Sequence, residues 1–154
     1  MYSATEHYSP HSPTSPVGQS PRGYGSQDAA SRATVMIVDD DPALLTLGRA
    51  ILSTLDLNIV VARSGEEALI SIQSPRLPEL VLLDLTMPGG MSGLETFDTL
   101  HEKHPQLPVV ACSGFFGDGA EEMCQHIGFA GMLPKPYTAE SLVSVVRRVL
   151  MCHA

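Results

Sequence analysis

Five short apolar runs alternate along this chain with segments in which apolar residues recur at spacings of three and four. Runs of this length predict β-strands, and the segments between them have the period of helices. Regular alternation of the two is typical of an α/β domain with a parallel sheet. The predicted strands are residues 34–38, 57–62, 80–83, 109–112 and 131–133.

Capping residues mark where the predicted helices begin. Asp41 can cap a helix that starts at Pro42, and residues 64–67 (Ser-Gly-Glu-Glu) form a capping box. The last helix is expected to start near Thr138. Each helix should turn an apolar stripe toward the sheet. The stripe residues are Leu44, Leu47, Ile51 and Leu55, then Leu94, Phe97 and Leu100, then Met123 and Ile127, and finally Leu142, Val145, Val146, Val149 and Leu150.

Residues 1–33 differ in composition from the rest of the chain. They contain no Leu, Ile or Phe and consist mainly of Ser, Pro, Gly and Tyr. Such a segment buries too little apolar surface to offset its ordering entropy, so we predict a disordered tail before a domain at 34–154. Its four Ser-Pro pairs, at Ser9, Ser12, Ser15 and Ser20, fit either a phosphorylated or partner-binding arm or a solvated leader.

The net charge of −8 belongs to the predicted domain, because Glu6 and Asp28 balance Arg22 and Arg32 in the tail. An acidic domain is a poor candidate for nucleic-acid binding and a better one for binding a cation. No apolar run is long enough to cross a bilayer, and the N-terminus lacks a signal-type apolar segment. The three cysteines, in no metal-type spacing, indicate reduced thiols. We therefore expect a cytoplasmic protein without a membrane partner.

Polar residues follow four of the predicted strands. Asp39 and Asp40 follow the first, Asp84 the third, Ser113 the fourth and Lys135 the fifth. The carboxyl ends of parallel strands meet at one edge of a sheet, so these groups should meet in space. Three carboxylates together raise one another's pKa unless a cation offsets them, and Mg²⁺ suits such oxygen ligands. A lysine and a hydroxyl can bind the oxygens of a phosphoryl group, which suggests phosphoryl transfer to Asp84.

The motifs around these residues resemble the receiver domains of two-component response regulators. The resemblance covers residue 34 to about 150 and includes all five predicted strands. It implies a flavodoxin-like, doubly wound, five-stranded parallel sheet of order 2-1-3-4-5 with five helices in three α/β/α layers. The matching motifs are Val38-Asp39-Asp40, Leu83-Asp84-Leu85-Thr86-Met87-Pro88, Gly93-Leu94-Glu95, Ser113-Gly114 and Lys135-Pro136.

The resemblance also implies a role for each site residue. Asp84 would accept the phosphoryl group, and Mg²⁺ would bind Asp40, Asp84 and the Thr86 backbone carbonyl directly. Asp39 would bind the metal mainly through water. Lys135 would pair with the phosphoryl oxygens, with a cis peptide bond to Pro136. Ser113 would hydrogen-bond the phosphoryl group and report its presence, next to Gly114, which leaves the site open.

The partners implied by the resemblance are proteins. The phosphoryl donor would be a phosphohistidine of a sensor histidine kinase or of a histidine phosphotransfer protein. A downstream target would dock on the fourth helix, fifth strand and last helix, a face that includes Arg147 and Arg148. The chain would be a signalling switch rather than an enzyme, catalysing only its own phosphorylation and dephosphorylation.

Two features depart from the common family pattern. The loop at 87–93 is one residue longer, through Gly89-Gly90. Met132 stands three residues before the lysine, where the family often has an aromatic residue whose ring takes part in switching. A further feature, the Ser113-Gly114 pair, resembles the pair found at this position in receivers that are attached to hybrid histidine kinases.

Several functions remain open from the sequence. Only four residues follow Leu150, which favours a stand-alone receiver, although a fragment of a hybrid kinase also fits. A degenerate receiver would bind partners without phosphorylation, but the retained site residues argue against it. A phosphatase of the haloacid-dehalogenase type would need a second aspartate two residues after Asp84, where this chain has Thr86.

Overall fold

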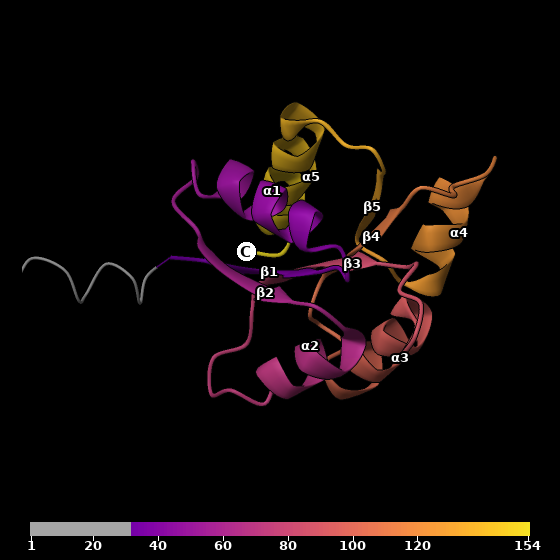
Figure 1. Ribbon diagram of the computed structural model, residues 1–154, viewed down its shortest axis with the longest axis horizontal. Helices are drawn as coiled ribbons and strands as arrows, with labels where there is room; N and C mark the ends of the chain where they lie inside the picture. Colours follow the sequence, from indigo (N-terminus) through magenta and orange to yellow (C-terminus); the bar gives the residue numbers. More distant parts are fainter. Residues whose placement is uncertain (1–31) are drawn as a thin grey trace, which may run out of the picture.

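A computed structural model describes residues 32–154, so the four Ser-Pro pairs and all but the last two residues of the predicted tail lie outside the described residues (Figure 1). The sheet has five parallel strands in the order β2-β1-β3-β4-β5, as predicted. The strands are β1 (Thr34–Val38), β2 (Asn58–Ala62), β3 (Leu80–Asp84), β4 (Val109–Ser113) and β5 (Gly131–Pro134). The helices are α1 (Pro42–Leu52), α2 (Gly65–Ser71), α3 (Gly93–Lys103), α4 (Ala120–Ile127) and α5 (Ala139–Cys152).

Helices cover both faces of the sheet. Helices α1 and α5 lie together on one face, and α2, α3 and α4 cover the other (Figure 1). All residues of β1, β3 and β4 are buried, because each strand sends alternate side chains into opposite helix layers. Met36, Val38, Val81 and Leu83 thus face α2 and α3, whereas Val35, Ile37, Leu80 and Leu82 face α1 and α5.

The predicted stripe of α1 is right in part, because Ile51 and Leu55 are partly buried against the core. Leu47 is 46% exposed, whereas Leu45, Gly48 and Leu52 form the buried face. Gly48 explains the difference, because a Cβ atom there would lie 3.1 Å from Ile37 Cδ1. A helix can approach a sheet closely at a glycine, and counting apolar residues overlooks that position.

In α3, Phe97 and Leu100 are buried as predicted, but one predicted stripe residue of α3 and both of those in α4 are exposed. Leu94, Met123 and Ile127 are 48%, 64% and 41% exposed, and Cys124 is the buried residue of α4. In α5, by contrast, Leu142, Val145, Val146 and Val149 are buried as predicted.

Within residues 32–154 no helix is long and apolar enough to span a membrane.

The helix caps follow the sequence with one exception. The Asp41 side chain accepts a hydrogen bond from Ala43 N at 2.8 Å, and Thr138 caps α5. At α2, Ser64 Oγ accepts from Glu67 N at 3.1 Å. The reciprocal half of the predicted box is replaced, because the Glu67 carboxylate accepts from Arg63 N instead.

Gly93 is where α3 packs directly against the end of β3. A Cβ atom at this position would lie 2.3 Å from the Asp84 carbonyl oxygen and 2.5 Å from Leu85 Cα. These are backbone atoms of a buried strand end, which cannot move aside as a flexible side chain can. Only glycine therefore allows this approach.

Gly93→Ala should lower the free energy of unfolding by about 2–3 kcal/mol, because relieving the overlap requires α3 to shift. The matched control is Gly117→Ala, since a Cβ atom at Gly117 would meet nothing within 4 Å. Urea unfolding followed by circular dichroism measures both variants. Equal stability of the two variants would contradict the close packing at Gly93.

Candidate acidic site at the carboxyl edge of the sheet

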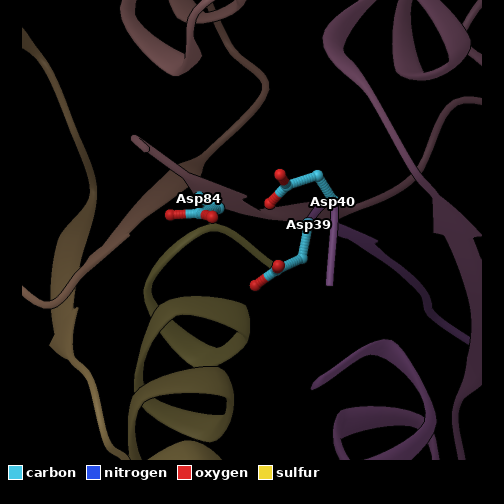
Figure 2. A group of neighbouring side chains, drawn as sticks. All are labelled: Asp39, Asp40 and Asp84. Carbon is cyan, nitrogen blue, oxygen red and sulfur yellow. The ribbon is translucent and has the colours of Figure 1, made fainter. Parts of the chain in front are cut away.

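Three carboxylates meet at the carboxyl edge of the sheet. Asp39 and Asp40 follow β1, and Asp84 ends β3; one oxygen from each lies within 4.8 Å of the others (Figure 2). Figure 2 shows the Asp40 carboxylate pointing toward Asp84. Asp39 and Asp84 are 3% and 4% exposed, whereas Asp40 is open to solvent. The site therefore has two buried carboxylates and one exposed carboxylate.

The strand register brings the buried carboxylates together. Val38 of β1 pairs with Leu83 of β3, so the next residues along the two strands are Asp39 and Asp84. Backbone amides then orient each side chain: Asp39 Oδ1 accepts from Asp41 N at 2.9 Å, and Asp84 Oδ1 accepts from Thr86 N at 3.0 Å. In both residues the second oxygen, Oδ2, remains for other partners.

Lys135 contacts both of these second oxygens. Its Nζ atom lies 2.5 Å from Asp39 Oδ2 and 3.1 Å from Asp84 Oδ2. The lysine follows β5, where its backbone N–H donates to the Ser113 carbonyl at 2.8 Å, and its bond to Pro136 is cis. Three carboxylates against one ammonium leave two negative charges on this group of four residues.

Burial and charge act on the pKa values in this site. Burial raises the pKa of Asp84, and the neighbouring Asp39 charge adds to this, although the Thr86 N–H and Lys135 oppose it. Burial alone lowers the pKa of Lys135, but its hydrogen bond and charge interactions with Asp39, together with those with Asp84, outweigh burial and raise that pKa. Lys135 is therefore held as a cation beside a carboxylate whose ionised form is disfavoured.

The remaining predicted site residues lie around this group. Ser113, at the end of β4, is buried, and its Oγ accepts from Phe115 N at 3.1 Å. A Cβ atom at Gly114 would meet only the Lys135 carbonyl oxygen, at 4.0 Å, so this side of the site is open. Met132 lies on β5 half-buried against the core next to α2 and α3.

One contact near the site was not expected from the sequence. Glu66 of α2, predicted only as part of a capping box, accepts from Met91 N at 2.9 Å in the loop after β3. The sequence holds two consecutive glutamates where a capping box needs only one, which was a partial signal that the other has a different partner. The hydrogen bond between Glu66 and Met91 joins residues 25 positions apart, so the partner itself depends on tertiary structure.

The donor set suits a hard divalent cation. The side chains are carboxylates, which Mg²⁺ prefers, and the exposed Asp40 gives access from solvent. The excess negative charge would favour such an ion. The described residues thus fit Mg²⁺ by chemistry and by charge.

Comparison with known proteins places this arrangement in a family. The profile of the "response regulator receiver domain" family matches residues 35–147. The nitrogen assimilation regulatory protein NtrX of Azorhizobium caulinodans is 32% identical over 117 residues, covering 75% of this chain and 26% of NtrX. The transcriptional activator ExaE of Pseudomonas putida is 38% identical over 123 residues, covering 78% of this chain and 56% of ExaE. The chain therefore spans about a quarter to about half of these relatives.

Solved structures agree with the sequence matches. The receiver domain of NtrX from Brucella abortus superposes with a TM-score of 0.70 at 31% identity, covering 76% of this chain and 98% of that domain. The chemotaxis protein CheY4 of Vibrio cholerae has the same fold, with a TM-score of 0.70 at 24% identity over 77% of this chain and 99% of that chain. With the family profile spanning most of its residues and all five strands in the receiver order, this chain belongs to the receiver domain family of two-component response regulators.

Proposed function

We propose that this receiver domain is a phosphorylation-dependent switch that accepts a phosphoryl group on Asp84 with the help of Mg²⁺. Membership of the receiver family supports a role in two-component signalling. The observation that carries the proposal is the position of Asp84. Its buried carboxylate lies within 4.8 Å of those of Asp39 and Asp40 and contacts the Lys135 ammonium.

In this proposal Asp40, Asp84 and the Thr86 carbonyl hold Mg²⁺, and Asp39 does so mainly through water. The ion would offset the negative charge of the transferring phosphoryl group. An Asp84 oxygen attacks phosphorus, the bond from phosphorus to the donor imidazole nitrogen breaks, and the imidazole leaves with the electron pair and takes up a proton. Lys135 then pairs with phosphoryl oxygens, and alignment by the site supplies much of the rate.

Ser113 and the partner surface would convert the modification into a signal. The Ser113 hydroxyl, now bonded to Phe115 N, would turn to the phosphoryl group. We propose that a sensor histidine kinase or histidine phosphotransfer protein is the donor. A downstream protein would dock on the face formed by α4, β5 and α5, where Arg148 is exposed beside Gly131. Arg147, which was expected on this face, lies instead beside residues 54–57. Thr86 in place of a second aspartate supports a switch over an enzyme with external substrates. The net charge of −8 supports protein rather than nucleic-acid partners. We propose a cytoplasmic location, in line with cysteines in no metal-type spacing.

Acetyl phosphate tests this chemistry without a partner protein. We expect intact-mass spectrometry to show one added phosphoryl group per chain in Mg²⁺, formed about a hundredfold more slowly in EDTA, because the metal supplies several kcal/mol of charge stabilisation. Mg²⁺ restored after EDTA treatment is the control for lasting damage. No phosphoryl group in Mg²⁺ would contradict the proposal and favour a degenerate receiver that binds partners without phosphorylation.

A further inference from the structure

The loop between β3 and α3, residues 85–92, contains Thr86, whose backbone carbonyl is one of the proposed Mg²⁺ ligands. At its start, Thr86 N donates to Asp84 Oδ1 at 3.0 Å. Its turn is glycine-rich, with Gly89 at φ +90° in the left-handed region. Met87, before the turn, is buried in the core, whereas Gly89 and Gly90 have no side chains that could fix the turn. The turn and the residues after it therefore depend on backbone hydrogen bonds to other side chains.

Two carboxylates bind consecutive amides at the far end of this loop. Glu66 Oε1 accepts from Met91 N at 2.9 Å, and Glu95 Oε2 accepts from Ser92 N at 2.8 Å. The Glu95 bond is local, because Glu95 and Ser92 form the capping box of α3. The Glu66 bond joins a different helix, α2, to the loop.

Close packing keeps the start of α2 beside the loop. A Cβ atom at Gly65 would lie 2.0 Å from Thr96 Oγ1 of α3 and 3.3 Å from Met91 Sδ. A Cβ atom at Gly90 would lie 3.1 Å from Glu66 Oε1, so the glycine leaves room for the carboxylate against the turn. Hydrogen bonding to the Met91 N–H lowers the pKa of Glu66, which is therefore ionised at neutral pH.

We infer that Glu66 is a positioning residue that fixes the β3–α3 loop to α2 and so holds the Thr86 carbonyl in place for Mg²⁺. This inference rests on the metal role proposed above for Asp40, Asp84 and Thr86. Glu66 itself would not contact the metal. It acts through the loop backbone, whose two ends are bonded to Asp84 and to Glu66.

Three variants separate this role from a general effect on α2. Glu66→Ala removes the acceptor, whereas Glu66→Gln keeps a side-chain oxygen that can accept from Met91 N. Glu67→Ala is the matched control, because Glu67 lies in the same first turn but bonds Arg63 N and not the loop. Two-dimensional amide NMR spectra verify that each variant is folded.

Amide hydrogen exchange and a Mg²⁺ titration, both followed by NMR, test the inference. In Glu66→Ala we expect the Met91 amide to exchange about tenfold faster and Mg²⁺ to bind about tenfold more weakly. Glu66→Gln and Glu67→Ala should stay within about twofold of the wild type in both measurements.

Unchanged Met91 exchange in Glu66→Ala would overturn the contact itself. Faster exchange with unchanged Mg²⁺ affinity, or equal loss of affinity in Glu66→Ala and Glu67→Ala, would overturn the positioning role alone. Absence of Mg²⁺ binding to the wild type would overturn the proposed metal role and with it this inference, a result distinct from either of the others.

Discussion

Asp84→Asn is expected to take up no phosphoryl group from acetyl phosphate in Mg²⁺, whereas the wild type takes up one. The amide has nearly the shape of the carboxylate but lacks its anionic oxygen, so it removes the proposed nucleophile and one metal ligand together. Intact-mass spectrometry measures the result. Asp98→Asn is a control on the α3 surface, where the side chain is exposed, and should behave as wild type. A phosphorylated Asp84→Asn would show that another residue is the acceptor.

The same substitution should change how stability depends on pH in metal-free buffer. The pKa of Asp84 is raised in the folded protein above its ordinary value of 3.8, chiefly by burial. The folded state therefore holds this proton more tightly than the unfolded state. The contribution of Asp84 to wild-type stability therefore falls as pH rises from 3.8 through the raised pKa. Asp84→Asn lacks this loss, so its stability relative to wild type should increase from pH 4 to pH 7 in EDTA. A constant or decreasing difference in urea unfolding would contradict the raised pKa.

Lys135→Ala should cost about 3–5 kcal/mol of unfolding free energy in metal-free buffer at neutral pH. It leaves the carboxylates of Asp39 and Asp84, both about 5% exposed as side chains, without the ammonium that contacts them. Removing one partner of a buried ion pair costs more than the pair itself contributes, because the other charge stays desolvated. Urea unfolding in EDTA measures the loss, and added Mg²⁺ should restore part of it.

Lys103→Ala is the matched control, since Lys103 is the other lysine of the chain and is exposed at the end of α3. It should change stability by no more than about 0.5 kcal/mol. A second check uses pH: the cost of Lys135→Ala should shrink in acid, where the carboxylates are protonated. Equal stability of Lys135→Ala and Lys103→Ala would show that Lys135 does not hold the acidic group together.

The presence of five parallel strands and the meeting of polar residues at one edge could be predicted because both follow from local signals, whereas the strand order was expected from the family resemblance. Apolar runs such as Leu80 to Leu83 predict buried strands, and parallel strands place their ends together. The cis bond before Pro136 was expected from the family resemblance. The strands and their shared edge need only the sequence of each element and the general rules of α/β sheets, whereas the strand order and the cis bond depend on the family resemblance.

The errors arose where packing between elements decides. Gly48 faces the sheet in α1, where a Cβ atom would lie only 3.1 Å from Ile37 Cδ1, and this tight contact can be recognised only from the three-dimensional distance. The bond of Glu66 to the Met91 amide likewise joins residues far apart in the chain. Periodicity carries no information about such pairs.

The most direct test of the proposed phosphorylation is to locate the phosphoryl group. Borohydride reduces an acyl phosphate to the alcohol, so a phosphorylated aspartate becomes homoserine. After acetyl phosphate, Mg²⁺ and borohydride, tandem mass spectrometry of peptides should find homoserine at position 84 and aspartate at Asp39 and Asp40. Homoserine at another aspartate, or at none, would contradict the assignment of Asp84 as the acceptor.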